Sequence, residues 1–144
     1  MAKLPLKLKA RIPNFMKDSH AWRRAIHAAV VEVQDRSKVR YGASDKLEVQ
    51  VRLHLENPKL TILDLDNRLK DILDALQGFV GDKGHSGELR PIIPNDSQIY
   101  RLIVEKRRPP KMDPGAPSFI EIRRYSHDER TTREPRTREK RRKT

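Results

Sequence analysis

Two aspartates near the middle of the chain are separated by a single residue, in the segment Leu63-Asp64-Leu65-Asp66. If they lie at the end of an extended stretch, this spacing directs both carboxylates to one side, with Cα atoms roughly 6 to 7 Å apart. Two such carboxylates can share a hard cation, because Mg²⁺ prefers oxygen ligands and keeps several waters. The pair therefore predicts part of a phosphoryl-transfer site, which a third acid would complete.

Asp96 is the best candidate for that third acid, because it immediately precedes a predicted strand. A side chain at such a position can lean over the edge of a sheet toward a neighbouring element. Lys70 follows Asp66 by four residues, which is one helical turn. Its ammonium could reach a phosphate or leaving oxygen bound beside the metal. We therefore expect a catalytic group made of Asp64, Asp66, Lys70 and Asp96.

Each of these residues also has a purely structural interpretation. Asp66 is an ordinary helix N-cap, Asp64 could favour the helix dipole, and Asp96 could be a turn residue before a strand. Lys70 could pair with Asp66 or Asp74 at i, i+4 spacing in a solvated helix interaction. The spacing of the two acids alone does not separate structure from catalysis.

The hydrophobic pattern along the chain predicts the elements that must position these residues. Alternating apolar residues are typical of half-buried strands, and apolar residues three and four apart are typical of amphipathic helices. Asp18 or Ser19 is placed to cap the first helix. The predicted elements are a strand over 3–12, a helix over 18–37, a strand over 47–56, a helix over 65–79, and strands over 98–106 and 118–125.

This β-α-β-α-β-β order predicts an α+β fold with a four-stranded mixed sheet packed against two helices. Residues 108–117 are expected to form a long hairpin connection between the last two strands. Residues 1–125 should form one domain. The segment 126–144 has almost no apolar residue and carries eight Lys or Arg against four Asp or Glu. We expect it to be a disordered basic tail.

Composition narrows the class of partner. The formal net charge of +12 predicts association with a polyanion, foremost nucleic acid, because neutralising phosphates releases their condensed counterions. The chain has no cysteine, which excludes thiolate catalysis and sulfur-based zinc sites. No secretory signal or membrane span is evident, so we expect a cytoplasmic protein that does not bind membranes. The cations expected on the outer strand faces, as DNA contacts, are Lys7, Lys9, Arg11 and Arg52.

One segment also resembles a known family. The run D-L-D-N, followed by Lys70 and by D-I-L-D-A-L-Q-G, with the strand start P-N-D-S-Q downstream, resembles the RusA family of Holliday junction resolvases. The resemblance implies a RusA-like fold, and it extends to most of the order of elements. It implies metal-binding roles for Asp64, Asp66 and Asp96, a catalytic role for Lys70, and a supporting role for Asn67. Arg68 is a further expected DNA contact.

The function implied is a Mg²⁺-dependent endonuclease, with Mn²⁺ as the alternative metal, that resolves Holliday junctions in DNA recombination and repair. Paired nicks in a two-fold symmetric junction imply a homodimer. No small-molecule cofactor is expected. Two alternatives stay open: a non-enzymatic basic nucleic-acid-binding protein, and a related metal nuclease that acts on flap or replication-fork DNA.

Overall fold

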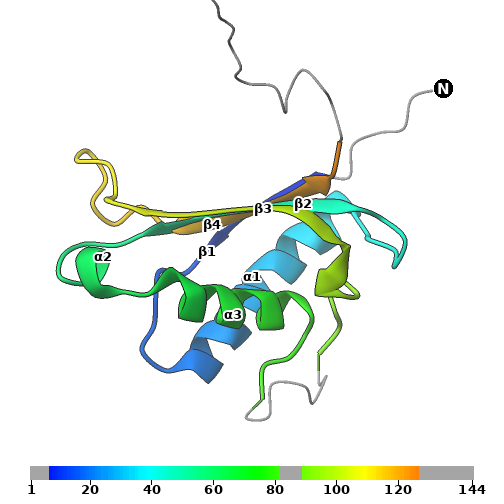
Figure 1. The fold of residues 1–144 in the computed structure, drawn as a ribbon, viewed down its shortest axis with the longest axis horizontal. Coiled ribbons are helices and arrows are strands. Elements are labelled where there is room, and N and C mark those ends of the chain that lie inside the picture. Colours follow the sequence, from blue (N-terminus) through cyan, green and yellow to red (C-terminus); the bar gives the residue numbers. More distant parts are fainter. Residues whose placement is uncertain (1–6, 82–88, 127–144) are drawn as a thin grey trace, which may run out of the picture.

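Four strands form one mixed sheet in the computed structural model, which describes residues 7–81 and 89–126, and the two long helices lie on one face of it (Figure 1). The other face of the sheet carries no helix from the described residues. The α+β architecture expected from the sequence is therefore confirmed. The elements are β1 (Leu8–Ile12), α1 (Ser19–Ser37), β2 (Leu47–His54), α2 (Lys59–Ile62), α3 (Leu65–Leu76), η1 (Asp96–Gln98), β3 (Ile99–Arg107) and β4 (Ser118–Arg124).

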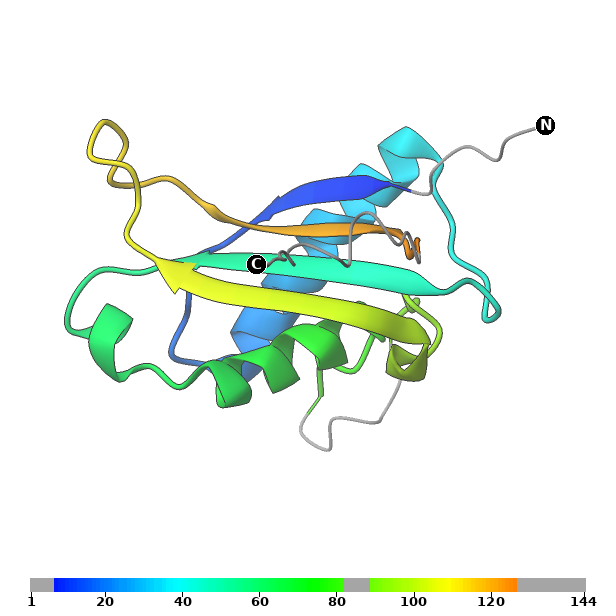
Figure 2. The ribbon, with the colours of Figure 1, turned by 45° about the horizontal axis from the view of Figure 1, so that its top comes forward.

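The strands lie in the order β1-β4-β2-β3, which can be followed in Figure 2. β4 pairs antiparallel with both β1 and β2, whereas β2 and β3 are parallel and are connected through α3. The predicted hairpin between the last two strands is wrong, because β2 lies between β3 and β4. Residues 108–117 instead carry the chain past β2, a step of about 10 Å between strands two positions apart.

The core forms where the apolar faces of the strands meet α1 and α3. Asp18 caps α1 through Oδ1, which accepts hydrogen bonds from the backbone N–H groups of His20 and Ala21 at 3.0 and 3.1 Å. Because the helix starts directly after this cap, Trp22 and Ile26 face the sheet, and both are fully buried. Opposite them lie the alternate residues of three strands: Leu8, Ala10, Ile12, Leu47, Val49, Val51, Leu53, Ile120 and Ile122.

Helix α3 is shorter than predicted and ends at Leu76, because the chain turns at Gly78, whose φ is +84°. A side chain at this position would meet the carbonyl of Leu89 on the returning chain. The sequence did not predict α2 or η1, both of which are a single turn long. Within the described residues, strand β1 begins at Leu8. The described part of the chain has no helix that is both long and apolar enough to cross a membrane.

The expectations for residues 3–6 and for the tail from residue 127 onward lie outside the described residues.

Candidate metal and nucleic-acid site

The first turn of α3 carries the predicted acid pair. Asp64 is the N-cap, with extended backbone angles (φ −86°, ψ 118°), and its Oδ1 accepts a hydrogen bond from the backbone N–H of Asp66 at 3.1 Å. The expected extended stretch ends at Asp64, because Asp66 already lies in the helix. Strand alternation therefore does not place the two carboxylates. The cap itself is Asp64 and not Asp66.

Both acids of this pair are open to solvent. Asp64 and Asp66 are both exposed, and neither carboxylate forms an ion pair within the described ranges. Lys106 of β3 lies nearby, but its ammonium donates a hydrogen bond to the backbone carbonyl of Leu63 at 2.8 Å. The negative charge at the start of α3 is left to solvent and to the helix dipole, which favours anions at this end.

Lys70 lies one turn further along α3 and is also exposed. It makes no ion pair within 4.0 Å to Asp66 or Asp74 in the described chain. Its charge nevertheless acts on Asp74. Desolvation raises the pKa of that carboxyl above its ordinary value, while Arg23 and then Lys70 oppose the rise. The lysine is therefore free to meet a ligand in solvent.

Asp96 lies at the opposite end of α3 from the acid pair. Its backbone N–H donates a hydrogen bond to Oε1 of Gln77 at 3.3 Å. Its negative charge also contributes, as the smallest cause, to raising the pKa of Asp74. Asp66 and Asp74 are two turns apart, about 12 Å along the helix axis. Within the described residues, no three acidic or histidine side chains lie close enough together to hold a metal ion. The structure brings Asp64 and Asp66 together but does not add Asp96 to them.

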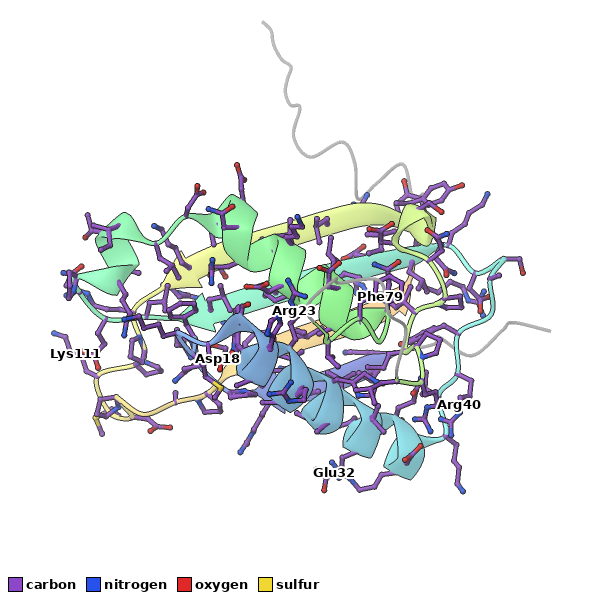
Figure 3. All side chains as sticks on the ribbon, turned by 90° about the horizontal axis from the view of Figure 1, so that it is seen from below. Asp18, Arg23, Glu32, Arg40, Phe79 and Lys111 are labelled. Atoms are coloured by element: carbon purple, nitrogen blue, oxygen red, sulfur yellow. The ribbon has the colours of Figure 1, made fainter. Side chains whose placement is uncertain are left out.

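A second set of charges lies between α1 and α3, and we call it the α1–α3 seam: Arg23 of α1 with Arg68, Asp71 and Asp74 of α3. Asp71 is buried, accepts a hydrogen bond from Arg23 at 3.0 Å and forms an ion pair with Arg68 at 3.3 Å. Arg23 also reaches Asp74 at 3.5 Å. In Figure 3 the labelled Arg23 lies between the two helices. Arg68, predicted as a DNA contact, is thus largely engaged inside the protein, with 20% of its side chain exposed.

The other predicted DNA contacts gather on the helix-free face of the sheet. Arg11, Phe119 and Arg52 lie side by side across β1, β4 and β2. Lys9 and Arg52 both stack over the Phe119 ring, at 4.7 and 5.0 Å from its centroid. Lys7 pairs with Glu121 at 3.6 Å. This face is basic as expected, but it lies across the sheet from α3 and its acids.

No family model matches the chain, and a search of curated proteins finds no match.

The donor chemistry of the acid pair fits a hard divalent cation. Asp64 and Asp66 offer carboxylate oxygens that no basic side chain in the described chain neutralises, which is what Mg²⁺ with several waters requires. Sequence reasoning missed Asp74 and Gln77 as the neighbours of Asp96. The sequence did offer a signal for Asp74 as a further acid of this helix, because it lies eight residues after Asp66 in the same predicted helix. Gln77 could not be found in this way, because its contact with Asp96 depends on the path of residues 78–95.

Proposed function

We propose that the chain is a Mg²⁺-dependent endonuclease that cuts branched DNA, with the Holliday junction as its substrate. One observation carries the proposal. Asp64 and Asp66 are exposed and have no cationic partner in the described chain, one turn before an exposed and unpaired Lys70. With 32 Lys or Arg against 20 Asp or Glu, cations are plentiful. Acids left unpaired in such a chain are available to a metal.

In this proposal Asp64 and Asp66 hold the metal, with Mn²⁺ as an alternative to Mg²⁺, and Asn67 supports them. A bound Mg²⁺ would polarise the phosphate and lower the pKa of an attacking water. The ammonium of Lys70 stabilises negative charge on the phosphate or on the leaving oxygen. Asp96 is assigned as the third ligand by the resemblance alone, since it lies at the other end of α3.

The partner class follows from charge and symmetry. The cations of the helix-free face, among them Lys9, Arg11 and Arg52, would hold the duplex arms by neutralising phosphates. A four-way junction needs two cuts related by a two-fold axis, so the active form would be a homodimer with one site per protomer. Sedimentation of the protein with and without a junction tests this stoichiometry.

A second candidate is a nucleic-acid-binding protein without catalytic activity. Two observations favour it: Asp64 has an ordinary structural task as the N-cap of α3, and the described residues hold no cluster of three metal ligands. In that case the basic face is the functional surface. Both candidates predict tight, salt-dependent DNA binding, and only the first predicts cleavage.

Incubation with a synthetic four-way junction, with and without Mg²⁺, separates the two. The nuclease proposal predicts paired nicks that require the metal and disappear in Asp66→Asn, whereas the matched control Asp113→Asn, an exposed aspartate in the β3–β4 connection, cleaves normally. Binding without cleavage would favour the second candidate. Equal cleavage of flap or fork DNA would point to a metal nuclease of broader substrate range.

A further inference from the structure

A pocket of about 640 Å³ opens where α2 meets the start of α3, directly beside the acid pair. Asp64 and Asn67 are among its lining residues, and α2 projects from the same end of the molecule as the β3–β4 connection (Figure 2). Its volume lies within the range of pockets that bury small organic ligands. The pocket is therefore large enough for a nucleotide-sized group.

The walls of the pocket are apolar. Ile62 contributes a side chain that is 72% exposed, although it belongs to a helix of only four residues with no buried member. Phe15 and Leu63 complete the apolar lining. The Phe15 ring is held in place by Trp22, which meets it edge to face at a centroid distance of 5.5 Å. Packing in the core does not account for Ile62, because that side chain points mostly into solvent.

Cations surround these apolar walls. The Arg68 guanidinium lies 4.9 Å from the Phe15 ring centroid, and the Lys59 ammonium lies 5.9 Å from it. Lys17 also lines the pocket. The Nε of Arg68 is buried and has no hydrogen-bond partner among the described residues. A donor left unsatisfied in this way costs free energy unless something else accepts from the arginine.

We propose that this pocket receives one unpaired nucleobase, and that Lys17 and Lys59 hold the phosphates that flank it. A purely apolar ligand would not need three cations, and a bare phosphate would not need the exposed Ile62. A nucleobase with its phosphate uses both, because bases stack on aromatic and apolar side chains while the backbone follows positive charge. The Asn67 amide can donate to and accept from the edge of the base.

The inference rests on the proposed function in one respect, namely that DNA is the ligand. It adds the reason why a branched substrate would be preferred. In a continuous duplex every base is stacked and paired, so none can enter the pocket without the cost of unstacking. That cost is lowest for a base that is already unpaired. A base seated here would lie beside Asp64, next to the proposed cleavage position.

The test uses the full chain in EDTA, so that binding is measured without cleavage. Three fluorescent probes are compared: an oligothymidine of eight nucleotides, a strand of the same length made of abasic sites, and a blunt DNA duplex. We expect Ile62→Ser to weaken oligothymidine binding by at least about fivefold, the lower end of the range for losing a base-stacking contact, and to leave duplex binding within about twofold. Met112→Ser, which alters a side chain that is 95% exposed outside the pocket, is the matched control and should change neither.

The abasic strand separates base recognition from phosphate recognition. It carries the same phosphates, so Ile62→Ser should not weaken its binding further. Phe15→Leu provides a second variant that keeps an apolar side chain in the wall. Circular dichroism confirms that each variant is folded. An Ile62→Ser protein that binds oligothymidine like the wild type, or that loses duplex and single-strand affinity equally, would overturn the inference. If Ile62→Ser weakens oligothymidine binding but the wild-type protein cleaves no DNA, the inference about the pocket is supported and only the proposed nuclease activity is overturned.

Discussion

Helix α3 presents charged residues on two sides that the fold treats in opposite ways. Toward α1, Asp71 is 5% exposed and is neutralised by two arginines at 3.0 and 3.3 Å. Toward solvent, Asp66 and Lys70 are exposed and have no ion pair in the described chain. The two sides belong to the same twelve-residue helix, so helix formation itself does not explain the difference.

The comparison separates charges that the fold requires from charges that it only tolerates. A buried carboxylate is costly unless it is paired, so the buried Asp71 depends on its two arginines. An exposed carboxylate has almost no such cost and contributes little to stability. Stability therefore explains the seam and leaves the acids at the start of α3 without a structural reason, apart from the cap made by Asp64. Four substitutions test this division.

Asp66→Asn should have the largest effect, and on catalysis alone. If Asp66 is a metal ligand, the rate of junction cleavage should fall by at least about 10³-fold, the upper end of the range for one electrostatic group. Junction binding should persist or tighten, because the change removes repulsion toward phosphate. Single-turnover cleavage under saturating Mg²⁺ measures the rate. Cleavage at the wild-type rate would exclude Asp66 as a ligand, and the same test applies to Asp64→Asn and Asp96→Asn.

Asp71→Ala should act on stability instead. The substitution leaves Arg68 without its ion-pair partner and Arg23 with Asp74 alone, and breaking a buried pair in this way costs about 3 to 5 kcal/mol. Urea unfolding measures the loss. The control is Asp35→Ala, which removes a carboxylate that is 51% exposed and paired with Arg40 and Arg90. That control should cost under about 1 kcal/mol. Equal losses in the two variants would remove the distinction between the two sides of α3.

Lys70→Ala gives opposite results under the two interpretations. If Lys70 stabilises charge beside the metal, single-turnover cleavage should fall by about 10²-fold with little change in folding. If it only supports α3, the free energy of unfolding should drop by about 0.3 to 0.5 kcal/mol and cleavage should hardly change. Lys70→Arg should rescue the rate only in part, because a planar guanidinium poorly copies a compact ammonium. A rate within about threefold of wild type would assign Lys70 to the surface.

Asp74 is the less buried acid of the seam, and its substitution should give the smallest effect. Desolvation raises the pKa of its carboxyl in the folded state, and Arg23 and Lys70 only partly oppose this. The folded protein therefore binds this proton more tightly than the unfolded chain, and the resulting stability is lost as the pH rises through the ordinary and then the raised pKa. Asp74→Asn should therefore gain stability relative to wild type as the pH rises from below to above the ordinary pKa of an aspartate. Thermal unfolding across this range measures it, and a constant difference would contradict the assignment.

Sequence patterns predicted those parts of the molecule that depend on local periodicity. Alternation in residues 47–56 and the spacing of Trp22 and Ile26 gave β2 and α1 almost to the residue. The order of the strands could not be predicted from the sequence. The pairing of β4 with β1 and β2 is a long-range contact, and the length of residues 108–117 allows this pairing as well as a hairpin between β3 and β4. The position of Asp96 beside Gln77, rather than beside Asp66, depends in the same way on how the chain returns after α3.

The turn at Gly78 has a consequence for how the sequence can diverge. The chain that returns after this turn is hydrogen-bonded to the end of α3. The backbone N–H groups of Ile92 and Ile93 both donate to the carbonyl of Leu76, at 2.8 and 3.0 Å. Leu89 donates to Gly78 itself. A methyl group at residue 78 would collide with the Leu89 carbonyl and disturb this contact between the two segments. In related sequences, this single glycine should therefore be retained.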